Sequence, residues 1–183
     1  MDVEEAIRTR HSVKVFSPDP VAPTLIAHCL NVAVWAPNHH LTEPWHFTVV
    51  QGAALVQFSD LVYHLVSVSH SGADKALGEK RKLLSAPVVI AVYATVDRES
   101  SKVTQENYAS TAAVIQNILL AAHNQGLGAV WRTPQILESL GVRSFLQVPE
   151  PSQPVGLIFV GHSAQREVPR RRTPAEQKTL WLG

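Results

Sequence analysis

Three groups of residues in this 183-residue chain have the types and spacing of ligand-binding sites. The first, Arg10-His11-Ser12-Val13-Lys14, places three basic side chains and a hydroxyl within five residues. Alternate residues of an extended segment face the same side, so Arg10, Ser12 and Lys14 would point together. A guanidinium, an ammonium and a hydroxyl on one face can bind a phosphate group. The alternative is a solvated basic turn at the end of a helix.

The second group is Ala36-Pro37-Asn38-His39-His40, followed by Pro44-Trp45-His46-Phe47. A proline-bounded loop with amide, imidazole and aromatic side chains suits a planar heteroaromatic ligand. The histidines could instead be surface or capping residues. A zinc site is not expected, because the three histidines lack a cysteine or a helical His-x-x-x-His pair.

The third group runs from Gln125 to Thr133, and its glycines Gly126 and Gly128 allow close backbone approach after a long helix. It is not a dinucleotide-binding fingerprint, because the order is helix, glycine, strand and a third glycine is missing. The chain also has no Walker motif and no G-x-S-x-G motif. A fourth group, Arg170–Arg172, is either a further anion contact or a solvated tail.

The composition narrows the class of protein. The length fits one domain, and 45% hydrophobic against 17% charged residues indicates an ordered globular chain with spare apolar surface, which hints at oligomerisation. A net charge of +1 does not indicate the strongly basic surface that binds nucleic acid. No apolar run is long enough to span a membrane. A single cysteine, Cys29, excludes an internal disulfide and favours the cytoplasm.

Hydrophobic periodicity and capping residues predict a mixture of helices and strands. Helices are expected over Asp2–Arg10, from Pro23 to before Pro37, and over Leu55–Val68, Thr104–Gln125 and Ile136–Leu140, the last ended by Gly141. Strands are expected over His46–Val50, Ala86–Val96, Gly128–Trp131 and Val155–Val160. The Ala86–Val96 run is so apolar that it should be covered on both faces.

These elements do not follow a regular strand–helix–strand repeat, which favours an α+β fold over a doubly wound parallel sheet. No linker divides the chain, so residues 1–183 are expected to form a single domain. Residues 162–183 are polar and basic, and end in Leu180-Trp181-Leu182. This tail has too few apolar residues to fold on itself, so we expect it to pack on the body or on a partner subunit.

The four groups, in this order, resemble the nitroreductase family, and most closely its short "minimal" branch. The family's opening motif is similar to Arg10 through Phe16, and its Ala-Pro…Pro-Trp-x-Phe motif is similar to Ala36 through Phe47. Its Ala-Ala…Gly-Leu-Gly…Trp motif is similar to Ala121 through Trp131, and a strand ending in Val160-Gly161 also matches. The resemblance covers essentially the whole chain.

This resemblance implies a mostly antiparallel sheet flanked by helices and an intertwined homodimer, with FMN bound in two equivalent sites at the interface. The implied FMN contacts are Arg10, His11, Ser12, Lys14, Trp35, Asn38, His39, Trp131, Arg132, Thr133, Arg170 and Arg172, of which Trp35 and His39 would reach the flavin of the other subunit. The implied contacts to the nicotinamide nucleotide are Ala121, Ala122, His123, Asn124, Gln125 and Gly126.

The resemblance also implies ping-pong hydride transfer from NAD(P)H to a nitroaromatic, quinone or related acceptor. The flavin would carry the chemistry, backbone groups near Arg132 and Thr133 would assist, and no metal is expected. Relatives of the same fold could instead act as a dehydrogenase, a dehalogenase or a flavin-fragmenting enzyme. A flavin-binding module without turnover, and a non-flavin protein that binds an acidic partner through its arginine-rich tail, are the remaining alternatives.

Overall fold

The computed structural model describes residues 1–69, 72–165 and 171–183. Its α-helices are α1 (Val3–Thr9), α2 (Pro23–Ala33), α3 (Gly52–Ser67), α4 (Ala73–Leu83), α5 (Ser101–Asn124) and α6 (Leu140–Phe145). Its strands are β1 (Trp45–Gln51), β2 (Val88–Thr95), β3 (Gly128–Arg132) and β4 (Ser152–Gly161). Short 3-10 helices are η1 (His39–Leu41), η2 (Gln135–Glu138) and η3 (Ala175–Lys178).

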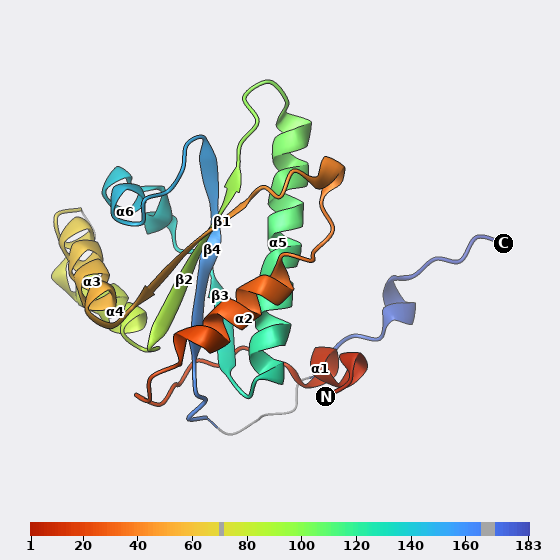
Figure 1. Ribbon diagram of the computed structural model, residues 1–183, viewed down its shortest axis with the longest axis horizontal. Coiled ribbons are helices and arrows are strands. Elements are labelled where there is room, and N and C mark those ends of the chain that lie inside the picture. Colours follow the sequence, from red (N-terminus) through yellow and green to blue (C-terminus); the bar gives the residue numbers. More distant parts are fainter. Residues whose placement is uncertain (70–71, 166–170) are drawn as a thin grey trace.

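The strands form one antiparallel sheet in the order β1-β2-β4-β3, which confirms the expected α+β class. Helices α2 and α5 cover one face of the sheet, and α3, α4 and α6 cover the other (Figure 1). β1 and β3 are therefore the two edge strands, and they lie on opposite sides of the sheet.

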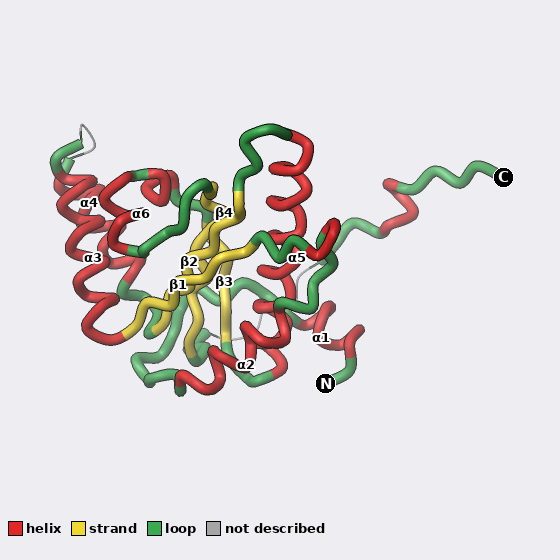
Figure 2. The backbone as a smooth tube through the Cα atoms, turned by 45° about the horizontal axis from the view of Figure 1, so that its top comes forward, coloured by secondary structure: helices red, strands yellow, loops and turns green. Residues whose placement is uncertain are grey.

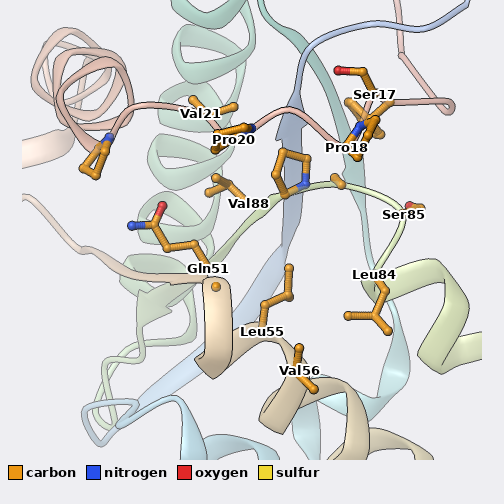
Figure 3. A pocket seen from close by; sticks show the side chains of 15 residues that line it. Ser17, Pro18, Pro20, Val21, Gln51, Leu55, Val56, Leu84, Ser85 and Val88 are labelled. Atoms are coloured by element: carbon orange, nitrogen blue, oxygen red, sulfur yellow. The ribbon is translucent and has the colours of Figure 1, made fainter.

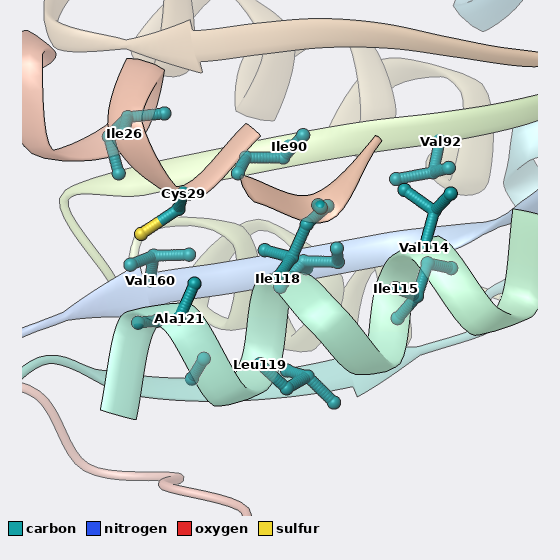
Figure 4. Packing of buried hydrophobic residues seen from close by; sticks show 14 of the residues in the cluster. Ile26, Cys29, Ile90, Val92, Val114, Ile115, Ile118, Leu119, Ala121 and Val160 are labelled. Carbon is teal, nitrogen blue, oxygen red and sulfur yellow. The ribbon is translucent and has the colours of Figure 1, made fainter. Parts of the chain in front are cut away.

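The core has two layers because the central strands are buried on both faces. Every β2 residue except the last is buried, as the Ala86–Val96 pattern predicts. On one side Ile118 and Val114 of α5 meet Ile90 and Val92 of β2 (Figure 4). On the other side the Phe58 ring of α3 stacks on the Phe145 ring of α6, with centroids 5.4 Å apart.

Local signals set the ends of the two helices that border the candidate site. The Asp2 carboxylate accepts a hydrogen bond from the Glu5 amide at 2.8 Å, so α1 starts at the expected cap. α5 begins slightly earlier than predicted, because the Ser100 hydroxyl accepts from the Val103 amide. It ends before Gly126, whose φ of +73° suits the glycine after a helix.

One helix was missed in the sequence, and one predicted helix differs from the structure. α4 was not predicted, because it is largely charged and buries only Ala76 and Leu83. The helix expected over Ile136–Leu140 is two elements, η2 and α6, and Gly141 lies inside α6 instead of ending a helix. Glycine lowers helix stability by about 1 kcal/mol but does not forbid a helical residue.

The C-terminal segment stands apart from the rest of the chain. All residues from 171 to 183 are exposed, and Figures 1 and 2 show this segment projecting away from the body on the side of α1. Within the described residues, 162–165 lie against the segment from Lys14 to Ser17, whereas 171–183 do not pack on their own domain. No described helix combines the length and apolar character needed to cross a bilayer.

Truncating a core side chain should reveal how much the α5 layer contributes to stability. Ile118 is 0% exposed, so Ile118→Ala should lower the free energy of unfolding by about 2–5 kcal/mol through lost burial and a residual cavity. Leu140→Ala, at a position 82% exposed, is the matched control and should cost about 0.5 kcal/mol or less. Urea unfolding would measure both, and equal losses would contradict the assigned core.

Candidate functional site

The first and third groups of the sequence come together at the start of β3. The Val13 amide donates a hydrogen bond to the Ala129 carbonyl at 3.1 Å, and Ser12 forms a parallel bridge with Ala129. Val13 is buried beside Gly128, where an added Cβ would lie 2.7 Å from a Val13 methyl carbon. Gly128 therefore allows the segment after α1 to lie directly against β3.

This segment is extended and held from both sides. The side-chain carbonyl of Gln165 accepts hydrogen bonds from the Lys14 amide at 2.8 Å and from the Val15 amide at 3.2 Å. Since Val13 faces the core, alternation places Ser12 and Lys14 on the outer side. Lys14 is exposed, while Arg10 and Ser12 are partly exposed, so three donors share a surface beside β3.

His11 faces a different space from its neighbours. Its Nδ1 donates to the Thr9 carbonyl at 3.3 Å, and its Nε2 is buried without a hydrogen-bond partner among the described residues. His11 lines a cavity of about 290 Å³ together with Val13, His123 and Gly126. The structure therefore separates His11 from Ser12 and Lys14, although all were predicted as FMN contacts.

The end of β3 holds an aromatic and a cationic side chain. The Trp131 indole donates to the Val155 carbonyl at 3.0 Å, which orients the ring along β4. The Arg132 guanidinium carbon lies 4.8 Å from the centre of the Phe159 ring. No carboxylate among the described residues forms an ion pair with Arg132, so its charge is open to a ligand.

A second cavity of about 290 Å³ adjoins this end of β3. Arg132, Thr133 and Pro134 line it, with apolar walls from α3, α4 and β4. Glu79 and Lys82 of α4 also line it and form an ion pair at 2.7 Å. Glu79 and Lys82 were not predicted as site residues. The only signal in the sequence is the basic run that follows Glu79.

The first half of the second group, together with Trp35 before it, forms an exposed loop between α2 and β1, whereas Trp45, His46 and Phe47 belong to β1. Trp35 is 88% exposed, and the rings of His39 and His40 have centroids 3.9 Å apart. His40, Leu41 and Glu43 have φ values of +54°, +53° and +44°. Such left-handed residues store backbone strain and are frequent in functional loops.

Asn38 holds this loop together from inside. Its side-chain oxygen accepts from the Glu43 amide at 2.9 Å, and its side-chain nitrogen donates to the Ala36 carbonyl at 3.4 Å. Both polar atoms of Asn38 are thus used within the loop. Asn38 was predicted as a direct cofactor contact, but its geometry is that of a residue that positions its neighbours.

The loop does not reach the β3 site in the same chain. No described residue between 35 and 47 lines the cavity at Arg132 and Thr133. The physical reason is the strand order, because the loop leads into β1 whereas Arg132 ends β3, and these are opposite edges. One chain therefore presents two partial surfaces.

The residues predicted for the nicotinamide nucleotide fall into two sets. Ala121 and Ala122 are packed into the core by α5, whereas the prediction places them at a nucleotide. His123, Asn124, Gln125 and Gly126 reach the surface at the end of α5. The His123 Nε2 lies 2.8 Å from the Thr9 hydroxyl oxygen, which ties this helix end to α1.

The remaining predicted residues are in the tail or in β1. Arg170 lies outside the described residues, and Arg172 lies in the exposed segment, where it donates to the Arg171 carbonyl.

His46 of β1 shares a hydrogen bond of 2.9 Å with the Thr95 hydroxyl, and burial lowers the pKa of its imidazole. Among residues 1–69, 72–165 and 171–183, no three potential ligands cluster as a metal site would require.

Residues 7–162 match the sequence model of the Nitroreductase family. The chain belongs to the nitroreductase family. A Bacillus subtilis relative, YfhC, named as an NAD(P)H nitroreductase, is 27% identical over 179 residues, which cover 96% of this chain and 92% of YfhC. A Methanothermobacter thermautotrophicus protein, named as an NADH dehydrogenase/NAD(P)H nitroreductase, is 33% identical over 167 residues, which cover 90% and 79% of the two chains.

The fold comparison agrees with this nitroreductase assignment. The crystal structure of a nitroreductase-like protein from Bacillus cereus superposes with a TM-score of 0.90 at 27% identity, covering 100% of this chain and 96% of that one. The mostly antiparallel sheet flanked by helices, expected from the resemblance, is thus confirmed.

The position of Trp131 should depend on the absence of a side chain at Gly156. An added Cβ there would lie 2.2 Å from the Trp131 indole nitrogen and 2.7 Å from the Arg132 carbonyl oxygen. Gly156→Ala should displace the indole, shift its fluorescence and lower the unfolding free energy by about 1–3 kcal/mol. Gly78→Ala, where nothing lies within 4 Å, should be neutral or stabilising, and similar behaviour of both variants would contradict the packing.

Proposed function

We propose that this nitroreductase-family chain is an FMN-dependent oxidoreductase that transfers electrons from NAD(P)H to a nitroaromatic, quinone or related organic acceptor. The observation that carries the proposal is the hydrogen bond between Val13 and Ala129. It places a cationic, hydroxyl-bearing segment beside the strand that leads to Arg132 and Thr133. A phosphate site and a site for a planar ring are thus neighbours, as FMN requires.

The residues present fit the phosphate end of FMN. Arg10 and Lys14 supply positive charge, and Ser12 supplies a hydroxyl, on a backbone fixed by Gln165. Charge-assisted hydrogen bonds to phosphate are about twice as strong as neutral ones. We also propose Arg170 and Arg172 as further contacts to the phosphate.

The residues present also fit the ring end. Arg132 and Thr133 border a cavity with apolar walls, and the uncompensated Arg132 charge favours electron-rich or negatively charged groups there. When bound, FMN would accept a hydride from NAD(P)H and pass the reducing equivalents to the acceptor. The backbone amides near Arg132 and Thr133 would orient the ring, and Arg132 would stabilise negative charge that develops beside it. Lys82 is already paired with Glu79.

We further propose that the active form is a homodimer. The loop with Trp35 and His39 is exposed, strained and remote from the Arg132 cavity of its own chain. A twofold axis that brings this loop to the partner's β3 site would complete two identical sites at once. Trp35 and His39 would then contact the flavin bound by the other subunit. Asn38 would hold them in place.

The remaining features fit a nitroreductase of the cytoplasm. The single cysteine, Cys29, is buried in α2, where burial raises the pKa of its thiol. A buried thiol with a raised pKa is poorly reactive, so it serves as core packing in a reducing compartment. The surface residues His123 to Gly126 are the part of the predicted nucleotide segment that can still meet NAD(P)H.

Anaerobic reduction tests the proposal most directly. The purified protein should be yellow, and NADPH or NADH added without oxygen should bleach the flavin absorbance, because electrons pass from the nucleotide to the ring. Adding a nitroaromatic compound or a quinone should restore the colour. A stable yellow colour after addition of both nucleotides would refute the proposed activity, and protein that stays colourless after incubation with FMN would refute the proposed cofactor.

The phosphate contact can be tested separately from turnover. Arg10→Met should raise the Kd for FMN by about 10- to 100-fold, since a charge-assisted hydrogen bond is worth about 1.5–3 kcal/mol. Arg8→Met is the matched control, because Arg8 is exposed and pairs with Glu4 on the same helix. Fluorescence titration with FMN measures both affinities, and an unchanged Kd for Arg10→Met would exclude its assigned role.

A further inference from the structure

Helix α5 carries two asparagines that hold the two ends of the loop between α2 and β1. Asn117 lies at the entrance of the loop, where its side-chain nitrogen donates to the Ala33 carbonyl at 3.2 Å. Asn107 lies at the exit, where its side-chain nitrogen donates to the Thr95 carbonyl at 3.1 Å. Ten residues of an α-helix span about 15 Å, so one rigid element sets the distance between the two ends. Figures 1 and 2 show the short helix η1 of this loop beside α5.

Thr95, the last residue of β2, connects Asn107 to the end of the loop. The Thr95 amide and the Thr95 hydroxyl both donate to the Pro44 carbonyl, at 2.8 and 3.2 Å. Because the hydroxyl proton is used in this way, the Thr95 hydroxyl oxygen accepts from the Nε2 of His46 at 2.9 Å. These bonds join α5, β1 and β2 at the point where the loop enters the sheet.

Asn107 also reaches the loop directly, although only 6% of it is exposed. The Thr42 hydroxyl lies 3.5 Å from the Asn107 side-chain oxygen and 3.2 Å from the His39 carbonyl oxygen, so it can donate to either. A buried amide with partners for its nitrogen and its oxygen is held in one orientation. Asn107 therefore gives the loop a fixed point on the rigid helix.

The loop needs such support because its backbone is strained. His40, Leu41 and Glu43 have positive φ values although none of them is a glycine. Conformations of this kind persist only where the surrounding structure holds them. Without the contacts from α5 the loop would relax, and Trp35 and His39 would lose their fixed positions.

We propose that Asn107 is a positioning residue, which holds the loop in the shape that Trp35 and His39 need to contact the flavin of the partner subunit. Asn117 has the same role at the loop entrance. The inference rests on the homodimer and the FMN site proposed above. Groups that are already fixed before binding lose less entropy when the ligand arrives, and reacting groups held in place react faster. Asn107 thus raises FMN affinity and turnover without touching the flavin.

Hydrogen exchange tests whether Asn107 holds the loop. Asn107→Leu keeps the size of the side chain and removes both polar atoms. The amides of Thr42 and Glu43 should then exchange about 3- to 10-fold faster, as expected for the loss of a buried hydrogen bond. Thr111→Val is the matched control, because Thr111 is buried on the same helix and its hydroxyl donates only to the Asn107 carbonyl. The loop amides of that variant should exchange as in the unchanged protein.

The opposite end of β1 provides an internal reference for this measurement. There Gln51 pairs with Val88 and both border a groove of about 730 Å³, which opens between the segment before α2, the start of α3 and the end of α4 (Figure 3). The amides of Gln51 and Val88 should keep their exchange rates in Asn107→Leu. Faster exchange at both ends of β1 would mean that the whole domain is loosened, and would contradict a role specific to the loop.

Flavin binding and kinetics separate positioning from packing. In Asn107→Leu the Kd for FMN should rise about 3- to 10-fold, and kcat with a nitroaromatic acceptor should fall by a similar factor. The KM for NADPH should change by less than twofold, since His123 and the proposed nucleotide segment lie at the other end of α5. Thr111→Val should leave all three constants unchanged.

A second pair of variants tests the same contact from the surface. Thr42 is exposed, so Thr42→Val removes its hydroxyl without disturbing the core. This variant should change loop exchange and FMN affinity in the same direction as Asn107→Leu, and it decides the matter should Asn107→Leu fail to fold. Thr42→Ser keeps the hydroxyl and should behave as the unchanged protein does.

Three results have distinct meanings. Unchanged loop exchange in both Asn107→Leu and Thr42→Val would refute the contact itself. Faster loop exchange with unchanged FMN affinity and kcat would refute the positioning role. Unchanged protein that binds no FMN would refute the proposed function, whereas exchange in that flavin-free protein would still show whether α5 holds the loop.

Discussion

The hydrogen bond from the Val13 amide to the Ala129 carbonyl joins the two parts of the chain on which the candidate site depends. It can form because Gly128 has no side chain, and any Cβ there would overlap Val13. Without this contact the Arg10–Lys14 segment would be a basic turn after a short helix. With it, the segment becomes part of the sheet edge, and its outward donors lie beside the strand that carries Arg132.

The rest of the fold holds that edge in place and leaves it open. β2 and β4 are buried between two helical layers, which fixes the sheet firmly. Among the described residues no strand pairs with the outer side of β1, whereas the outer side of β3 meets the Ser12–Val13 segment. The proposed ligand-binding and partner-binding surfaces therefore lie at the two edges. Because these edges face away from each other, the loop before β1 does not reach the Arg132 cavity of its own chain, and the proposed dimer would bring it to the partner's cavity.

Much of the fold could be predicted because its elements bury regular apolar patterns. The α5 helix and the Ala86–Val96 strand were recognisable since each presents apolar residues at the period of its structure. α4 escaped because its charges outnumber the two residues it buries, and its stability comes from packing on α3. Gly141 was misread because glycine ends helices often, whereas here neighbouring packing keeps it helical.

The sequence by itself determined which chemical groups this protein can offer: a cationic triad after α1, an aromatic loop before β1 and a glycine-flanked strand before Arg132. Residue type sets charge, hydrogen-bonding capacity and local backbone preference, and these are local properties. Only the tertiary structure decided that His11 faces another cavity, that Asn38 braces its loop, that Ala121 and Ala122 are buried, and that Glu79 and Lys82 join the site. Those outcomes depend on long-range packing and strand order, which bring together residues far apart in the chain.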